Sequence, residues 1–233
     1  MYLFYFVMDS IMYNIKKVNN VYLLTFRRNL LMKKYYVLHN PLAGNGNKDE
    51  SYKTLKLFTE NETEFLEITN LSGYKKLFES MRPQDVLVIC GGDGTLNRFV
   101  NDVPYLPEND ILYYPTGSGN DFWRDLAGKV TEGEPYKINE YLVDLPSVEV
   151  NGVKRYFLNN VGYGIDGYCC EVGDKLKLKN PDKKVNYTAI AIKGLLFDFK
   201  TVNAEITVDG VQYNFDHVWL APTMNGKFYG GGM

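Results

Sequence analysis

Residues 85–97 read DVLVICGGDGTLN, an apolar run that passes directly into a glycine-rich loop. The run at 85–90 is rich in β-branched residues, which is typical of a strand buried on both faces of a parallel sheet. A polar stretch with apolar spacing follows and predicts a helix over 95–103. Because glycine lets the backbone approach another group closely, this strand, loop and helix indicate a place where the chain contacts a ligand.

The rest of the first half alternates in the same way. Strands are predicted at 35–40, 63–69 and 111–115, and helices at 49–60, 71–81 and 119–127. Strands that alternate with helices predict right-handed βαβ units and a parallel sheet. After Gly128 the pattern changes to consecutive strands over 135–164, one helix over 186–199, and hairpin turns at Asn151-Gly152 and Asp209-Gly210.

The predicted fold class is therefore α/β, with an N-terminal parallel-sheet domain followed by an incomplete, mostly antiparallel β domain. We expect an atypical extension at 1–31, an α/β domain at 32–130 and a β-rich domain at 131–233. The apolar opening of the extension is too short to span a bilayer, and Met32 resembles an ordinary protein start. An over-extended start codon is favoured, with a short interfacial anchor or an extra helix as alternatives. The terminal GGGM predicts a sequence cut inside its second domain.

Composition excludes several classes of protein. The net charge of −2 lacks the basic excess of a nucleic-acid-binding domain. The three cysteines form no C-x-x-C pair and indicate a reducing cytoplasm. With two histidines in the chain, a histidine-rich metal site is not expected, and no segment reads as a transmembrane span.

Three glycine loops, at 40–46, 91–95 and 115–121, each follow a predicted parallel strand. Ligands bind beyond the carboxyl ends of such strands, and backbone N–H groups at turns and helix N-termini suit phosphate. One such loop could be only a tight turn, but three at one sheet edge favour a phosphate site. No Walker A motif is present, and GYGIDG at 162–167 matches a dinucleotide fingerprint only in isolation.

Asp93 and Asp121 each lie in one of these loops. A carboxylate beside phosphates requires a Mg²⁺ ion, a water network or a proton transfer to make it favourable. The alternative is helix capping, since Asp93, Thr95 and Asn120 all suit an N-cap position. The two roles can coexist.

HNPLAGNG, GGDGTLN, PTGSGNDFWRDL and FLNNVGYGIDG together resemble the diacylglycerol kinase catalytic-domain family, which includes sphingosine, ceramide and bacterial lipid kinases. The resemblance covers about 33–233. GGDGT alone is shared with NAD kinases and echoed in phosphofructokinases, so the second loop motif makes the resemblance specific. It implies ATP and Mg²⁺ as cofactors and a nucleotide-binding role for Asn40, Pro41, Gly44, Gly46, Thr69, Gly91, Gly92, Asp93, Gly94, Thr95, Asn97, Gly117, Ser118, Gly119 and Asn120.

The resemblance also implies that Asp93 and Asp121 are catalytic and hold Mg²⁺ indirectly through water. Gly162, Gly164 and Asp166 match the segment that begins the lipid-substrate domain. Arg98 and Trp123 depart from the family pattern, where glutamate and alanine are common. The family's general base is expected beyond Met233, so we expect little turnover from this chain alone.

The predicted function is transfer of the ATP γ-phosphate to a hydroxyl of a lipid such as diacylglycerol, within phospholipid biosynthesis. The enzyme would be cytoplasmic and peripheral at the inner membrane surface, with a membrane lipid as partner and no nucleic acid. An NAD kinase-like enzyme and a non-catalytic nucleotide-binding module are the alternatives. A lysine run at 175–184 predicts either contact with anionic headgroups or a solvated charged surface.

Overall fold

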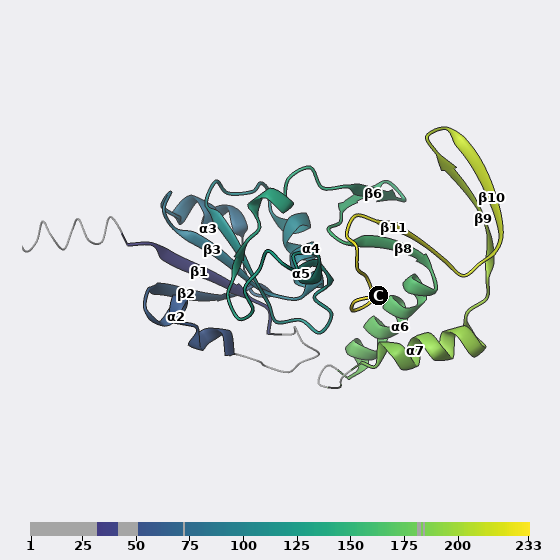
Figure 1. Cartoon of the computed structure of the whole chain (residues 1–233), viewed down its shortest axis with the longest axis horizontal. Coiled ribbons are helices and arrows are strands. Elements are labelled where there is room, and N and C mark those ends of the chain that lie inside the picture. The colour runs from purple at the N-terminus through teal and green to yellow at the C-terminus, as the bar shows by residue number, and fades with distance from the viewer. Residues whose placement is uncertain (1–31, 42–50, 72, 181–182, 184) are drawn as a thin grey trace, which may run out of the picture.

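The structure is a computed structural model that describes residues 32–41, 51–71, 73–180, 183 and 185–233. Figure 1 shows two regions side by side, an α/β region around a central sheet and a second region of strand pairs and helices. Predictions for 1–31, for Ser72 and for Gly44 and Gly46 lie outside the described residues. Within the described residues, no helix combines the length and apolar character needed to cross a membrane.

The α/β region is built on a five-stranded sheet in the order β2-β1-β3-β4-β5. Its first four strands run parallel and β5 pairs antiparallel with β4. The predicted parallel sheet is thus confirmed, with one antiparallel edge. The strands are β1 (Lys34–His39), β2 (Glu62–Glu67), β3 (Val86–Gly91), β4 (Asp110–Pro115) and β5 (Tyr136–Lys137).

Helices cover both faces of this sheet because successive side chains of the central strands point to opposite sides. Leu38 and Ile89 pack on one face with helices α3 (Tyr74–Ser80), α4 (Asp93–Asp102) and α5 (Asp121–Asp125). Their neighbours Val37 and Val88 pack on the other face with Phe58 of α2 (Lys56–Thr59). All six residues of β3 are buried, as its continuous apolar run predicts.

The second region consists of antiparallel strand pairs and helices. β6 (Ser147–Val150) pairs with β7 (Val153–Tyr156), and β8 (Asn160–Gly164) pairs with β11 (Leu220–Met224). β9 (Val202–Val208) and β10 (Val211–Val218) form a hairpin. Helix α6 (Ile165–Lys179) follows β8, and α7 (Tyr187–Lys193) continues into a π-helical segment, η4 (Gly194–Asp198).

Both predicted hairpins are present, but three sequence predictions were wrong in detail. The helix expected over 49–60 is divided, in its described part, into a 3₁₀ turn η2 (Ser51–Thr54) and α2, because Leu55 between them is extended. The strand run expected over 135–164 is interrupted by a 3₁₀ turn η3 (Asn139–Tyr141). Helix α6 was not predicted, and it carries the first lysines of the basic run.

Asp85 joins the starts of two strands at the amino end of the sheet, opposite the glycine loops. Its carboxylate, 1% exposed, accepts hydrogen bonds from Lys34 N (3.1 Å) and Arg82 N (2.8 Å) and pairs with the Arg82 guanidinium at 2.8 Å. Burial acts to raise the pKa of Asp85, but the hydrogen bonds from Arg82 and Lys34 outweigh it and lower that pKa. The carboxylate therefore stays ionised and fixes the entry into β3.

Candidate functional site

The loop at 91–95 links β3 directly to helix α4, whose N-cap is Gly92. The backbone oxygen of Gly92 accepts from Thr95 N (2.9 Å) and Leu96 N (3.2 Å), which starts the helix. Tyr113, fully buried on β4, donates its hydroxyl to the Gly91 carbonyl oxygen at 3.0 Å. Burial raises the pKa of Tyr113 well above its ordinary value, and the charge of Asp93 adds to this rise, so the hydroxyl remains a donor that supports the loop.

The second glycine loop, at 115–121, lies in direct backbone contact with the first. A Cβ placed on Gly117 would come within 2.4 Å of Gly92 Cα, which no side chain tolerates. Thr116 N also donates to the Gly91 oxygen at 2.9 Å, so strand pairing continues into the loops. We call residues 91–95 and 115–121 the loop cluster. Its tight approach is the physical reason for glycine at both positions.

Asn120 closes the second loop through hydrogen bonds within that loop and does not cap helix α5, which begins at the next residue. It adopts a left-handed conformation (φ 52°), and its side chain exchanges hydrogen bonds with Gly117 N (3.1 Å) and Gly117 O (2.7 Å). No side-chain cap hydrogen bond from Asn120 is present at α5.

The carboxylate of Asp93 takes that capping role from the neighbouring loop. Its two oxygens accept from Asp121 N and Phe122 N, each at 2.9 Å. Asp93 therefore caps helix α5 rather than its own helix α4, a possibility that local sequence spacing does not reveal. This contact ties the two loops together through a charge-assisted pair of hydrogen bonds.

Asn159, just before β8, was missed as a site residue. Its Nδ2 donates to Asp93 Oδ1 at 3.0 Å, and its backbone oxygen accepts from Asn225 N and Gly226 N at 2.8 Å each. Its Oδ1 is buried, with no hydrogen-bond partner within the described residues. Asn159 was quoted within FLNNVGYGIDG, but only the structure connects it to a residue 66 positions earlier.

Asp121, the last residue of the loop cluster, is buried. Its Oδ2 accepts from Gly231 N at 2.9 Å. Its Oδ1 lies 3.8 Å from Arg124 Nε, and among the described residues this oxygen has no hydrogen-bond partner. A buried carboxylate oxygen without a hydrogen-bond partner is a suitable ligand for a Mg²⁺ ion or for one of its bound water molecules. Asp121 thus fits the indirect metal role that the resemblance implies.

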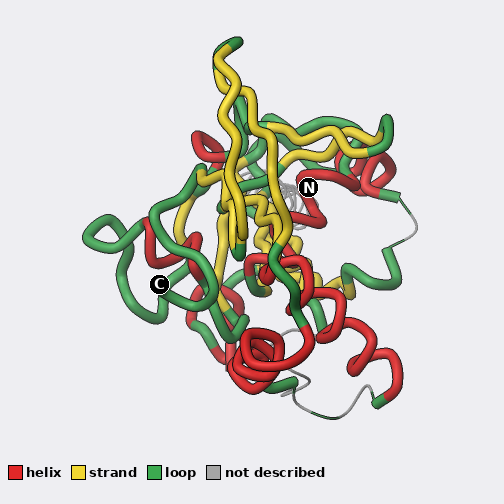
Figure 2. Tube along the Cα trace, turned by 90° about the vertical axis from the view of Figure 1, so that its right-hand side faces the viewer, coloured by secondary structure: helices red, strands yellow, loops and turns green. Residues whose placement is uncertain are grey.

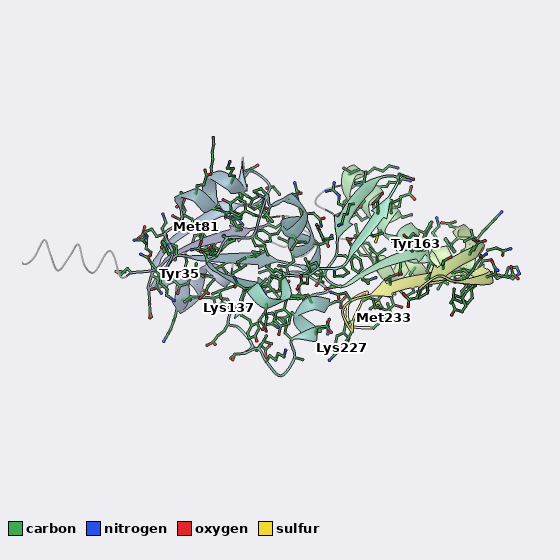
Figure 3. All side chains as sticks on the ribbon, turned by 90° about the horizontal axis from the view of Figure 1, so that it is seen from above. Tyr35, Met81, Lys137, Tyr163, Lys227 and Met233 are labelled. Atoms are coloured by element: carbon green, nitrogen blue, oxygen red, sulfur yellow. The ribbon has the colours of Figure 1, made fainter. Side chains whose placement is uncertain are left out.

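The segment that reaches Asp121 lies between the two regions, as the C-terminal end of the chain in Figure 1 and the labels Lys227 and Met233 in Figure 3 show. Lys227 N donates to both oxygens of Asp125 at 3.0 Å. A Cβ on Gly232 would lie 3.1 Å from the Arg124 guanidinium. Helix α5 is therefore contacted along its length by residues more than a hundred positions later.

The first glycine loop is described only at its start. Asn40 Nδ2 donates to Thr95 Oγ1 at 3.0 Å, which links the end of β1 to the loop cluster. Thr69 is exposed beyond the end of β2, next to Ile68, whose N–H donates to the His39 oxygen at 2.9 Å. Asn40, Thr69 and the loop cluster thus share the carboxyl edge of the parallel strands. Pro41 follows Asn40 directly.

The remaining predicted residues divide into two groups. Gly94, Asn97 and Ser118 are exposed at or beside the loop cluster, while Gly119 is half-buried. Gly162, Gly164 and Asp166 lie instead at the junction of β8 and α6. Gly164 (φ 89°) allows the close approach of Trp219 O, and burial raises the pKa of Asp166, whose Oδ2 has no hydrogen-bond partner in the described part of the chain. Their role as substrate-domain residues stays a prediction.

Arg98, where the family pattern favours glutamate, lies on the outer face of α4. It pairs with Asp102 at 3.0 Å and is largely exposed. Within the described residues, no group of three or more histidine, cysteine, aspartate or glutamate side chains is placed to hold a metal ion.

Comparison with known proteins identifies the class. Residues 34–148 match the family model described as "Diacylglycerol kinase catalytic domain", and similar curated proteins are named "Putative lipid kinase" or "Diacylglycerol kinase". The class of protein that this match indicates is the one defined by the diacylglycerol kinase catalytic domain. Residues 34–148 therefore belong to the diacylglycerol kinase catalytic-domain family, which confirms the resemblance drawn from the motifs.

Three relatives show the extent of the similarity. "Putative lipid kinase YtlR" of Bacillus subtilis (strain 168) is 26% identical over 164 residues, covering 63% of this chain and 52% of the relative. "Diacylglycerol kinase" of the same organism is 27% identical over 201 residues, covering 77% and 61%. "Putative lipid kinase" of Staphylococcus aureus (strain Newman) is 28% identical over 152 residues, covering 63% and 48%. The matched part of the chain spans about half to three fifths of these relatives.

Proposed function

We propose that this protein is an ATP-dependent kinase that transfers the γ-phosphate to a hydroxyl group of a lipid such as diacylglycerol. The observation that carries the proposal is the loop cluster, in which Gly92 and Gly117 touch while Asp93 and Asp121 lie beside them. Phosphoryl transfer depends mainly on positioning and electrostatic stabilisation. A site of backbone N–H groups and two oriented carboxylates suits that requirement.

The residues of the cluster have separable roles in this proposal. The first N–H groups of helix α4 have no acceptor within the helix, so they would bind phosphate oxygens. Thr95, held by Asn40 at 3.0 Å, would orient the loop. Asp93 would keep the second loop in place through its bonds to Asp121 N and Phe122 N.

Asp121 would hold Mg²⁺ through a water molecule at its Oδ1, which has no hydrogen-bond partner among the described residues. When bound, the ion supplies positive charge that neutralises the phosphate oxygens. The enzyme would act in the cytoplasm at the inner membrane surface, because its acceptor is a membrane lipid. Its product, a phosphorylated lipid, would serve phospholipid biosynthesis.

Two alternatives remain as outcomes of the test. An NAD kinase-like enzyme would share GGDGT, although the second loop motif and the family match favour a lipid acceptor. A non-catalytic nucleotide-binding module gains support from Asp93, since both of its carboxylate oxygens already accept hydrogen bonds from the protein.

The test is incubation of the full-length protein with Mg²⁺ and γ-labelled ATP. Micellar diacylglycerol, phosphatidylglycerol and sphingosine are offered as acceptors, with NAD⁺ in a parallel reaction. We expect labelled phosphate in one of the lipids. In the Asp93→Asn variant, phosphate transfer should fall at least about a hundredfold, because a misplaced hydrogen-bond donor weakens electrostatic stabilisation in the site. Label in NADP⁺ would overturn the lipid assignment.

The matched control is Asp102→Asn, which removes an exposed carboxylate from the same helix, α4. This variant should retain transfer within about twofold, because exposed ion pairs contribute little. Circular dichroism of both variants checks that each is folded. Equal loss in both would contradict a special role for Asp93, and ATP binding without label in any acceptor would support the binding module.

A further inference from the structure

The side chain of Asn159 connects the second region to the loop cluster. Its Nδ2 donates to Asp93 Oδ1 at 3.0 Å across 66 positions of sequence. In Figure 2 the second region faces the viewer and lies in front of the α/β region, so this contact joins the two. Because a carboxylate only accepts hydrogen bonds, the amide must present its nitrogen to Asp93 and direct its oxygen elsewhere.

The backbone beneath Asn159 is held from both sides. Leu158, the residue before it, is 5% exposed and packs in the hydrophobic core of the α/β region. The Leu158 oxygen accepts from Asn225 Nδ2 at 2.7 Å, and the Asn159 oxygen accepts from Asn225 N and Gly226 N at 2.8 Å each. These bonds do not involve the Asn159 side chain. The amide therefore starts from a fixed point, which a positioning group requires.

Asp93 receives two other hydrogen bonds, both from the start of helix α5. Asp121 N and Phe122 N each donate to its carboxylate at 2.9 Å, so they fix Asp93 relative to α5. Asn159 supplies a third donor from a different part of the chain, which fixes the carboxylate relative to β8 as well. Three donors also compensate the negative charge of Asp93, and this compensation would make the carboxylate tolerable beside phosphate oxygens.

The other end of the Asn159 amide carries a cost. Its Oδ1 is buried and has no hydrogen-bond partner in the part of the chain that the structure describes. A buried acceptor in this state lowers stability, and an apolar side chain at the same place would avoid that loss. Local conflicts of this kind are expected at functional sites. The donor on Nδ2 is therefore the feature that explains asparagine at this position.

We propose that Asn159 is a positioning residue that orients Asp93 for ATP binding and makes the phosphate site depend on the second region. It acts through Asp93 and not by contact with the nucleotide. The inference rests on the proposed kinase function. The alternative is a simple tie between the regions, such as Asn101 on α4 makes with the backbone of Tyr156.

The first experiment follows amide hydrogen exchange of the full-length protein by NMR, without nucleotide. Asn159→Ala should accelerate exchange of the Asp121 and Phe122 amides about tenfold, because the carboxylate that accepts from both loses its orientation. The matched control is Asn101→Ala, which also removes an asparagine that bridges the regions. It should leave these two amides within about twofold of their rates in the unchanged protein.

The second experiment measures steady-state kinetics with ATP and a lipid acceptor. Asn159→Ala should raise the KM for ATP about tenfold and leave the KM for the lipid within about twofold. Asn159→Asp has almost the same shape as the natural side chain, but it removes the donor and brings a second carboxyl group against Asp93. It should raise the KM for ATP about a hundredfold. A packing role would reverse this order, because aspartate fills the site better than alanine.

Stability measurements separate positioning from loss of folded protein. The melting temperature of Asn159→Ala should stay within about 2 °C of the unchanged protein, because the lost hydrogen bond is offset by removal of the unpartnered oxygen. A fall in kcat with both KM values unchanged would indicate less folded enzyme and overturn the proposal. A rise in the lipid KM alone would assign Asn159 to acceptor binding and would also overturn it.

The two readouts distinguish this proposal from the kinase assignment. Faster exchange at Asp121 and Phe122 in Asn159→Ala, with no labelled acceptor from the unchanged protein, would support the positioning of Asp93 and contradict the kinase assignment. Lipid phosphorylation with the same kinetics in Asn159→Ala, and with unchanged exchange at both amides, would do the reverse.

Discussion

Strands β3 and β10 both carry apolar side chains, five of six residues in β3 and four of eight in β10, but their surroundings are opposite. All six residues of β3 are buried, whereas seven of the eight residues of β10 are exposed. Beyond Leu158, Val185 and Ile190 are the buried hydrophobic side chains among the described residues. Strand formation follows from local preference, but burial depends on neighbouring elements. The α/β region therefore carries the core, and the second region carries surface.

The largest expected difference between the two strands is the loss of stability when one apolar side chain in each is shortened to alanine. Leu87→Ala, at a fully buried position of β3, should lower the free energy of unfolding by about 2 to 5 kcal/mol. Val211→Ala, on the exposed hairpin, should lower it by less than about 0.5 kcal/mol. Urea unfolding followed by circular dichroism measures both. Similar losses would mean that the hairpin is buried in the protein in solution.

A second test sharpens the comparison at the loop cluster, the part of the α/β region that meets the second region. Gly117→Ala should destabilise the protein by about 1 to 3 kcal/mol, because its Cβ would collide with Gly92 Cα at 2.4 Å. Gly94→Ala is the control, since a Cβ there has open space and alanine favours a helix. Its melting temperature should be unchanged or slightly higher. Equal destabilisation by both would argue against the close approach of the loops.

A third test uses pH at the opposite end of the sheet. The pKa of Asp85 is lower in the folded protein than its ordinary value of 3.8, so its stabilisation is present above that value. It is lost as the pH falls through the folded pKa. Asp85→Asn should lower the free energy of unfolding by about 1 to 2 kcal/mol at pH 7, and the difference should shrink below pH 3.8. A difference that grows in acid would contradict the assignment.

The smallest expected effect lies at the contact between the regions. Asn101 on α4 exchanges two hydrogen bonds of 2.9 Å with the backbone of Tyr156 on β7. Asn101→Ala should cost about 1 kcal/mol or less, since the contact is exposed. Amide hydrogen exchange at Tyr156 should accelerate while exchange in β3 is unchanged. Acceleration in both strands would show that the regions unfold together.

The α/β region was predicted well because its local sequence patterns each require one particular environment. The apolar run of β3 requires burial on both faces, and the glycines after it require a tight turn. Helix α6 was missed although Ile165, Tyr168, Val172 and Leu176 have helical spacing, because glycines before it and alternating lysines at its end obscure that pattern. The helix expected over 49–60 was divided at Leu55, whose side chain packs against the core that includes Phe58.

The candidate site was predictable in its loops but not in its connections. Asp93 and Asp121 were selected as chemically important, and both lie together in the cluster. Asn159 and Gly231 were not selected, because their contacts with these aspartates span 66 and 110 positions. Local spacing carries no information about partners at that separation.

The hydrogen bonds of Asp93 and Asp121 also set an order of assembly. The sheet and the two glycine loops lie within the first part of the chain that a ribosome makes, and they can pair early. The carboxylates of Asp93 and Asp121 also accept hydrogen bonds from Asn159 and Gly231, which are synthesised much later. Contacts of such long separation form slowly. The fully connected cluster is therefore expected to mature last, after the surrounding sheet has already become resistant to proteolysis.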